Sequence, residues 1–286
     1  MIGDGYIASK LGEKLAIIYR EYSIITLSPT TSPPIDLTDI STFEPLREIL
    51  SNSIVYILAA VSSDPAVLAD RSRAFKVNVE GMFNFSTFLY SKCKPSTVIF
   101  TSSEWVYSPR GEAEVSTDPR HQTSPYGRQK LFAETLLLEL SEAWQVKTYI
   151  CRLGIVWGGR SLGGACESIS SQYSVLRNRH SVKLMLGNLS SARRFIHVAD
   201  AVFALARIHK AEQKIYDLAG PEVVYVRDIV AACEKHFGFA VEVNERDIHP
   251  SYKALPKELI LNPPFTWVKK DFATRMEEYL SEYFPV

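Results

Sequence analysis

The sequence predicts an α/β protein in which a parallel sheet is covered by helices on both faces. Strand-like segments rich in Ile, Val, Tyr and Leu alternate with segments of helical length through most of the 286 residues. A glycine pair, Gly3 and Gly5, stands directly before the first helical segment, which is where a doubly wound sheet has its first turn. An apolar fraction of 46% supplies a core of this size. We therefore expect a doubly wound sheet with a small C-terminal lobe.

The N-terminal half shows the most regular alternation. The expected strands, which are short apolar runs typical of a parallel sheet, are Tyr22–Ser28, Ser53–Ala60, Thr97–Ser103 and Lys147–Leu153. The expected helices are Gly5–Arg20, Thr42–Ser51, Asp70–Ser91 and Pro125–Trp144.

Only Met1 and Ile2 precede the glycine turn, so we expect a truncated first strand. In a doubly wound sheet this strand lies in the middle. Its loss would expose the edges of its neighbours and leave the turn poorly anchored. A recorded start downstream of the true one, a fragment, or a degenerate protein that no longer turns over substrate would each account for the pattern.

Beyond Gly158 the alternation loosens. Gly159–Gly164 is expected to be a glycine-rich loop, and expected helices near Ala201–His209 and Val226–Phe237 interleave with short strands. We therefore divide the chain into a main domain, residues 1–158, and a lobe, residues 159–286, that is interleaved with the last strands of the sheet.

Composition narrows the class of partner. Thirty-two basic and thirty-two acidic residues give a net charge of zero, so neither nucleic acid nor a membrane surface is expected as a bulk partner. The four cysteines have no metal-ligand spacing, so we expect reduced thiols and no metal site. No segment has the pattern of a targeting signal or a membrane span, and we expect a cytoplasmic protein.

One set of residues indicates proton-transfer chemistry. Tyr126 and Lys130 share one face of an expected helix, and Ser103 ends a buried strand. In such a set the tyrosine exchanges a proton with a carbonyl or alcohol, the lysine charge lowers the pKa of the tyrosine, and the serine holds the reacting oxygen. The alternative is a surface tyrosine beside a solvated lysine.

The run from Gly3 to Ala8 has the form GxGxxA, which lets a dinucleotide pyrophosphate approach a helix N-terminus. The alternative is an ordinary turn before a helix. The expected strand that ends at Ser28 has no acidic residue there for an unphosphorylated ribose. Thr26, Ser28, Thr30 and Thr31 carry hydroxyl groups that can bind a 2′-phosphate, which slightly favours NADP over NAD. The alternative is that these residues only form a polar turn.

The glycine turn, the strand that ends in Ser103 and the Tyr126–Lys130 pair follow one another along the chain as they do in the extended short-chain dehydrogenase/reductases. This family comprises NAD(P)-dependent epimerases, dehydratases and reductases of nucleotide sugars. The chain resembles the family almost from end to end. The resemblance implies a Rossmann-type domain in residues 1–158, a substrate-binding lobe, and catalytic roles for Ser103, Tyr126 and Lys130. It implies NAD or NADP as cofactor, bound by Gly3, Gly5, Tyr6, Ile7, Asp36, Leu37, Leu58, Ala59, Ala60, Asn78, Tyr126 and Lys130.

The same resemblance implies substrate contacts and a partner. Glu104 and Trp105 follow the catalytic serine, and Arg193, which begins the run RRFIHVAD, is expected to meet a nucleotide diphosphate. His197 in that run is expected to be structural. Family members commonly pair through helices that correspond to Asp70–Ser91 and Pro125–Trp144, so a homodimer is expected by analogy.

Departures from the family pattern select the reaction. Dehydratases of the family have a second carboxylate, and double epimerases a cysteine, where this chain has Trp105. Both chemistries are therefore disfavoured, unless Glu104 replaces the missing acid. The remaining reaction is hydride and proton exchange at one carbon, as keto reduction or 4-epimerisation of a nucleotide-linked sugar.

Two other readings stay open. Ile155 stands where the family usually has an asparagine that contacts the substrate, so a small non-nucleotide ketone or alcohol is a second substrate class. A non-catalytic dinucleotide-binding sensor or scaffold of the same fold is the alternative from another functional class.

Overall fold

The structure is a computed structural model that describes residues 1–109, 115–116, 124–159, 164–177, 183–212, 214–220, 222–245 and 270–285. The chain forms two compact units. Unit 1 comprises Met1–Leu153 and Val202–Asp217, and unit 2 comprises Gly154–Ala201 with the described residues after 217. The division therefore differs from 1–158 and 159–286, because the chain returns to unit 1 to add a last strand to its sheet. Most of the expected loop Gly159–Gly164 lies outside the described residues.

Unit 1 contains a four-stranded sheet in the order β1-β2-β5-β10. Its strands are β1 (Ile54–Ile57), β2 (Thr97–Ser103), β5 (Lys147–Leu153) and β10 (Ile215–Leu218). β2 pairs in parallel with β1 and with β5, in register from Thr97 opposite Lys147 to Ser103 opposite Leu153. All seven residues of β2 are buried, as expected for an apolar run in a parallel sheet that is covered on both faces. The expected strands Thr97–Ser103 and Lys147–Leu153 are confirmed with the same bounds.

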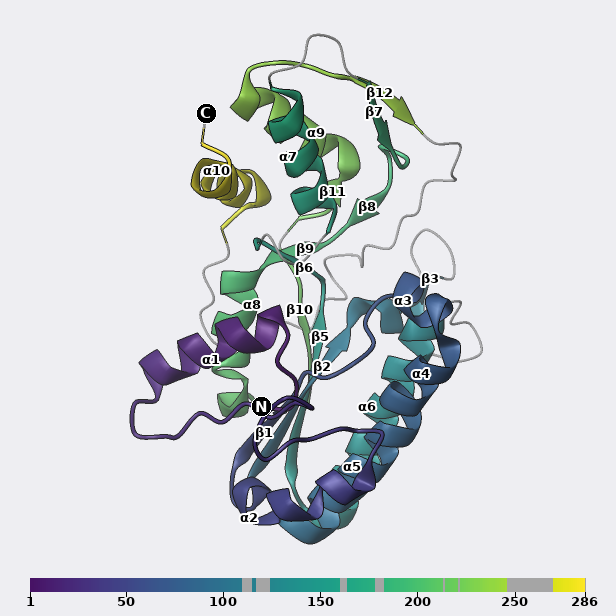
Figure 1. Ribbon diagram of the computed structural model, residues 1–286, viewed down its shortest axis with the longest axis vertical. Helices are drawn as coiled ribbons and strands as arrows, with labels where there is room; N and C mark the ends of the chain where they lie inside the picture. Colours follow the sequence, from purple (N-terminus) through teal and green to yellow (C-terminus); the bar gives the residue numbers. More distant parts are fainter. Residues whose placement is uncertain are drawn as a thin grey trace. The chain divides into compact units, whose positions relative to one another are not determined.

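Helices cover both faces of this sheet (Figure 1). Helix α1 (Tyr6–Ile18) lies on one face, and the helices α4 (Arg71–Phe75), α5 (Met82–Phe88) and α6 (Pro125–Trp144) lie on the other. Two π-helical segments, η3 (Lys76–Gly81) and η4 (Leu89–Cys93), flank α5. The remaining elements of this unit are η1 (Ile40–Thr42), η2 (Glu44–Leu46), α2 (Arg47–Leu50), α3 (Asp64–Ala69), η5 (Glu104–Val106), β3 (Ser108–Pro109), β4 (Val115–Ser116), the end of α8 (Val198–Leu205) and η6 (Ile208–Lys210).

The expected strand Tyr22–Ser28 is wrong. Among its residues only Leu27 makes a bridge, an isolated parallel one to Ile2, which also bridges Ile57. A strand needs a partner along its length, and the chain supplies only Met1 and Ile2 ahead of the glycine turn. A cavity of about 340 Å³ lies beside these segments, and its lining includes Met1, Ile25 and Tyr56.

The glycine turn is nevertheless well anchored, contrary to the expectation from the short N-terminal segment. The Gly3 amide donates to the Leu27 carbonyl at 2.8 Å, and the Leu58 amide donates to the Ile2 carbonyl at 2.9 Å. The turn that leads into α1 is thus held by backbone hydrogen bonds on both sides.

Unit 2 consists of helices and short two-stranded ladders. Its helices are α7 (Ala165–Leu176), α9 (Val226–Phe237), α10 (Phe272–Tyr283) and the start of α8. The ladders pair β6 (Ile155–Trp157) with β9 (Phe195–His197), β7 (Lys183–Leu186) with β12 (Glu242–Glu245), and β8 (Ala192–Arg193) with β11 (Val224–Tyr225). The expected helix Val226–Phe237 is confirmed. The core of this unit combines aliphatic side chains with large aromatic ones, among them Trp157, Tyr173 and Tyr279.

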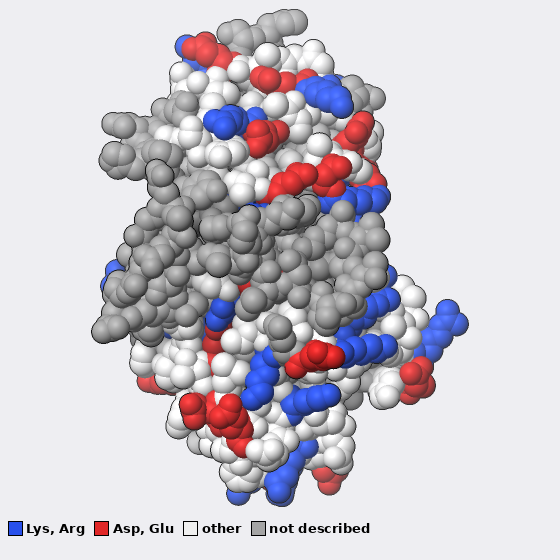
Figure 2. Space-filling view, turned by 180° about the vertical axis from the view of Figure 1, so that it is seen from behind, with Lys and Arg blue, Asp and Glu red and all other residues white. Residues whose placement is uncertain are grey.

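The described surface has mixed charge. Figure 2 shows lysine and arginine side chains interspersed with aspartate and glutamate on the face in view. Among the described residues no helix has the length and apolar character needed to cross a bilayer. Cys93, Cys151, Cys166 and Cys233 are free and buried.

Candidate functional site

Helix α6 carries two of the candidate catalytic residues. The Ser124 hydroxyl accepts a hydrogen bond from the Gly127 amide at 2.9 Å, and Pro125 occupies the first turn. This N-cap begins the helix just before Tyr126. Tyr126 is 8% exposed and Lys130 is 4% exposed, so the alternative of a surface tyrosine beside a solvated lysine is excluded.

The Tyr126 ring lies in a small apolar cluster with Val67, Ala74 and Trp105. The Asp64 carboxylate accepts hydrogen bonds from the Tyr126 amide at 3.0 Å and from the Ser124 hydroxyl at 2.7 Å. Burial, and secondly the negative charge of Asp64, raise the pKa of Tyr126. This direction is opposite to the lowered pKa expected from the sequence, because burial disfavours the charged phenolate.

Lys130 is tied to the central strand of the sheet. Its ammonium group donates to the Thr101 carbonyl of β2 at 2.8 Å, and it lies 4.5 Å from the Phe100 ring centroid and 5.8 Å from the Tyr126 ring centroid. Burial lowers the pKa of Lys130 to about 8, while the Glu134 carboxylate opposes this shift. Lys130 is therefore charged near neutral pH and loses its charge on mild alkalinisation.

Ser103 is the last residue of β2 and caps η5. Its hydroxyl oxygen accepts a hydrogen bond from the Trp105 amide at 3.3 Å. Trp105 in turn packs against the Tyr126 cluster, so β2, η5 and α6 meet at one place. Glu104, predicted to contact substrate, is buried at 6% exposure.

The glycine turn fits a pyrophosphate. Gly3 has φ +106°, and a side chain there would place its Cβ 2.9 Å from the Ala59 nitrogen, so only glycine is tolerated. Gly5 is the N-cap of α1 and has no side-chain cap, and a Cβ built there meets nothing within 4 Å. The open space in front of the helix N-terminus, with Tyr6 and Ile7 in its first turn, matches the anion site of dinucleotide-binding folds.

The other predicted cofactor residues surround the same end of the sheet. Leu58, Ala59 and Ala60 follow the carboxyl end of β1 directly. Asn78, in the π-helical segment η3, accepts from the Val61 amide at 2.9 Å and donates to the Val61 carbonyl and to the Gln129 side chain. Asn78 therefore braces the loop after β1 against α6, which is a positioning role.

Asp36 and Leu37 lie in a tight turn. The Asp36 carboxylate accepts hydrogen bonds from the amide and the hydroxyl of Thr38, both at 2.8 Å. Leu37 is buried, and its carbonyl approaches Gly81 so closely that a Cβ at Gly81 would lie 2.6 Å away. Gly81 thus allows η3 to pack on this turn.

The hydroxyl groups near Ser28 bond largely with one another. The Ser28 and Thr30 hydroxyls are 3.0 Å apart, and the Thr31 hydroxyl accepts from the Ser28 amide at 3.0 Å. Thr30 also donates to the Asp4 carboxylate at 3.5 Å. The polar turn considered from the sequence therefore forms, and it includes one negative charge.

Arg193 and His197, which the sequence singled out in one run, belong to unit 2. Arg193 ends β8, and its guanidinium donates to the Ala192 carbonyl at 2.7 Å. His197 accepts from the Ala199 amide at 3.3 Å and packs edge-on against Trp157, with ring centroids 5.2 Å apart. Burial lowers the pKa of His197 to about 4, so it is neutral and structural, as expected.

The sequence reasoning missed several residues of the site. Asp64 bonds the start of α6 from 62 residues away, and only its place beside Pro65 in a helix start gave a local signal. Glu134 could have been found, because it follows Lys130 by one helical turn.

Comparisons with known proteins agree with this arrangement. The profile of the NAD dependent epimerase/dehydratase family matches residues 3–219. The dTDP-L-rhamnose 4-epimerase of Burkholderia thailandensis is 24% identical over 290 residues, covering 82% of this chain and 80% of that protein.

Solved structures are similar in fold. The UDP-glucose 4-epimerase of Thermus thermophilus, in complex with NAD, has a TM-score of 0.74 at 20% identity and covers 96% of both chains. The L-threonine 3-dehydrogenase of Trypanosoma brucei has a TM-score of 0.78 at 16% identity, covering 97% of this chain and 94% of that one. With the profile match spanning most of the sequence, the chain belongs to the NAD dependent epimerase/dehydratase family.

Proposed function

We propose that this protein is an NAD(P)-dependent enzyme that epimerises or reduces a nucleotide-linked sugar at one carbon. The observation that carries the proposal is the hydrogen bond from Lys130 to Thr101, which holds the buried Tyr126–Lys130 pair against the strand that ends in Ser103. The nucleotide-sugar class is supported by the rhamnose epimerase relative and by the UDP-glucose epimerase fold neighbour.

Each residue then has one task. Tyr126, whose pKa is raised, is protonated at neutral pH and donates its proton to a carbonyl oxygen; in the reverse direction the Lys130 charge favours loss of that proton. Ser103 holds the reacting oxygen with its hydroxyl. Bound NAD(P) supplies the hydride acceptor and donor. The glycine turn and the N-terminus of α1 hold its pyrophosphate.

We favour NAD over NADP, in contrast to the slight preference from the sequence. The Ser28–Thr31 hydroxyls already have partners, and the Asp4 carboxylate beside Thr30 would repel a 2′-phosphate. Fluorescence titration with NADH and NADPH tests this choice: NADH should bind more tightly, and Asp4→Asn should narrow the difference.

The proposed function is tested by incubating the purified protein and NAD with dTDP- and UDP-hexoses and following the sugars by NMR. Turnover is expected, and Tyr126→Phe should reduce it by about 10²-fold to 10⁴-fold while cofactor affinity is retained. Normal cofactor binding without turnover of any nucleotide sugar contradicts the proposal. If, in addition, Tyr126→Phe leaves the biological activity unchanged, the sensor or scaffold reading is favoured.

A second substrate class has its own support. L-Threonine 3-dehydrogenase is a fold neighbour with a small substrate that has no nucleotide. Arg193→Ala separates the two classes: a large rise in KM for nucleotide sugars supports a diphosphate contact, whereas an unchanged KM favours a small ketone or alcohol.

Homodimer formation is also proposed. Phe75, Phe83 and Phe132, on α4, α5 and α6, are 49%, 51% and 41% exposed, which fits the helix pairing expected from the family. Sedimentation of wild type and Phe83→Glu tests this, with a dimer expected for the first and a monomer for the second.

A further inference from the structure

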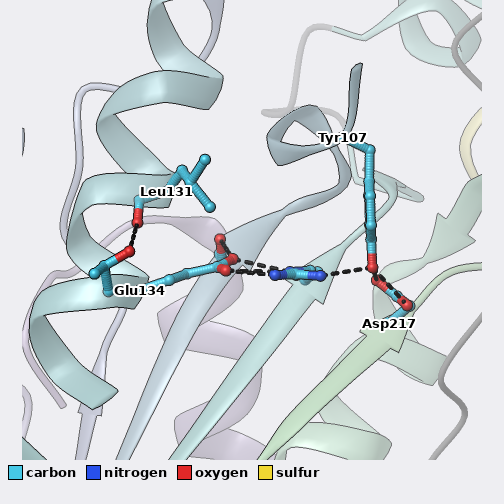
Figure 3. A network of polar contacts seen from close by, with 7 residues as sticks. Tyr107, Leu131, Glu134 and Asp217 are labelled. Atoms are coloured by element: carbon cyan, nitrogen blue, oxygen red, sulfur yellow. Dashed lines mark hydrogen bonds and ion pairs between the residues drawn. The ribbon is translucent and has the colours of Figure 1, made fainter. Parts of the chain in front are cut away.

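Figure 3 shows a chain of polar side chains that runs from Glu134 to Tyr107 and Asp217. It begins at Glu134, one helical turn after Lys130 and 2% exposed. The Glu134 carboxylate accepts hydrogen bonds from Arg152 Nε at 3.0 Å and from Arg152 Nη2 at 2.6 Å, and a third from the Ser102 hydroxyl at 2.5 Å. Both members of this ion pair are therefore enclosed by protein.

The chain continues across the sheet. Arg152 Nη1 donates to the Tyr107 hydroxyl at 2.6 Å, and this hydroxyl donates to both Asp217 carboxylate oxygens at 3.0 and 3.1 Å. We call Glu134, Arg152, Tyr107 and Asp217 the buried relay. It links α6 with β5 and β10, and its members Arg152 and Asp217 stand at the ends of the two segments of unit 1 that lead into unit 2.

Stability alone is a poor reason for such a relay. Removing two charges from water costs about as much as their attraction returns, so a buried pair contributes little net stability compared with apolar packing. The relay does have an electrostatic consequence at the site. Burial lowers the pKa of Lys130, and the Glu134 carboxylate is the charge that opposes this effect.

We propose that Glu134 and Arg152 are positioning residues that set the charge of Lys130. The Glu134 carboxylate keeps Lys130 protonated, and the Arg152 guanidinium balances Glu134 so that this effect is moderate. The proposal deepens the proposed function and rests on it for its catalytic meaning. Neither residue is assigned a contact with substrate or cofactor.

The direct test is the titration of Lys130 in ¹⁵N-lysine-labelled protein without substrate, with its Nζ signal identified by its loss in Lys130→Met. Glu134→Gln should move the midpoint, about 8 in the wild type, down by about one pH unit, because a stabilising negative charge is lost. Arg152→Met should move it upward, because Glu134 then acts without its counter-charge. The double variant Glu134→Gln/Arg152→Met should titrate close to wild type.

Opposite shifts of the Lys130 midpoint distinguish charge setting from a merely structural role, which would shift the midpoint of both single variants in the same direction.

Tyr107→Phe is the matched control, since it cuts the relay but removes no charge; it should leave the midpoint unchanged. Because breaking a buried pair destabilises a fold, the double variant and Tyr107→Phe also serve where a single variant does not fold. A Lys130 midpoint in the double variant that lies far from wild type, or a Tyr107→Phe shift as large as a full unit, overturns the proposal.

The same variants separate this inference from the proposed function. If turnover is found, and its fall at alkaline pH follows the Lys130 midpoints across the variants, both the proposed function and the charge setting are supported. If Lys130 titrates as described but no nucleotide sugar is turned over, the proposed function fails and the charge setting stands. If turnover occurs with midpoints that do not move, the relay is overturned alone.

Discussion

The two units of this protein differ in how their buried charged side chains are arranged. In unit 1, the region behind the candidate site encloses charged side chains, Lys130, Glu134, Arg152 and Asp217, each at most 7% exposed. Unit 2 also buries single charged residues, such as Asp200, but its core combines aliphatic side chains with aromatic rings, and Trp157 packs against Phe272 and Tyr279 at ring-centroid distances of 5.2 and 5.7 Å.

This difference indicates that buried side chains serve different purposes in the two units. Buried charges contribute little net stability, but they fix geometry and protonation where a reaction needs both. Aromatic side chains contribute stability through the large area that they bury. We therefore expect substitutions in unit 1 to alter pH dependence and rate, and substitutions in unit 2 to alter stability.

The largest expected effect tests the aromatic core. Trp157→Ala should lower the free energy of unfolding by about 4 kcal/mol, because it leaves a cavity among packed rings. Urea denaturation followed by circular dichroism measures this, and Trp144→Ala, at a site 44% exposed, is the control with an expected loss below about 1 kcal/mol. Equal losses in the two variants would contradict a special contribution of the packed rings around Trp157.

The next effect concerns the buried lysine. Lys130→Met should lower kcat about 100-fold, equal to about 2.7 kcal/mol, and should abolish an alkaline limb near pH 8, where Lys130 loses its charge. Initial rates from pH 6 to pH 9.5 measure both, and Lys10→Met on the surface of α1 should match wild type. A persistent limb near pH 8 in Lys130→Met would assign that limb to another group.

A smaller effect is expected from His197 in unit 2. Its folded pKa, about 4, lies below the ordinary histidine value of 6.5, so the unfolded chain binds the proton first and stability falls as the pH drops from 6.5 towards 4. Between pH 6.5 and pH 5 the loss should reach at most about 2 kcal/mol. The pKa of His209 is also lowered, so His197 accounts only for the part of the pH dependence of the unfolding free energy that His197→Gln removes. If that pH dependence is the same in His197→Gln as in the wild type, the assignment to His197 is wrong.

The smallest effect is expected at an exposed ion pair. Lys183 and Glu242 join β7 and β12 at 2.7 Å, with side chains 59% and 62% exposed. Lys183→Ala should cost less than about 1 kcal/mol, and this loss should shrink in 0.5 M salt. A larger, salt-independent loss would mean that unit 2 also depends on charge.

Prediction from sequence succeeded where the cause is local. The bounds of α6 follow from the Ser124 cap, Pro125 in the first turn and an uninterrupted helical run, and β2 follows from an apolar run that is buried on both faces. It failed for Tyr22–Ser28, because an apolar run becomes a strand only when a neighbouring segment pairs with it. The backbone of Met1 bonds Ile25 and Leu27, and these contacts amount to one isolated bridge, Ile2 to Leu27.

The sequence by itself determined that Tyr126 and Lys130 share a helical face, that a glycine turn opens α1, and that the family is an epimerase/dehydratase one. These features depend on neighbours within a few residues or on motif order. Only the tertiary structure decided the electrostatics of the site. Asp64 and Arg152 reach α6 from positions 62 and 18 residues away, and burial raises the pKa of Tyr126 instead of lowering it. Burial and long-range charges exist only once the chain is folded, so the protonation of the Tyr126–Lys130 pair could not be read from its spacing.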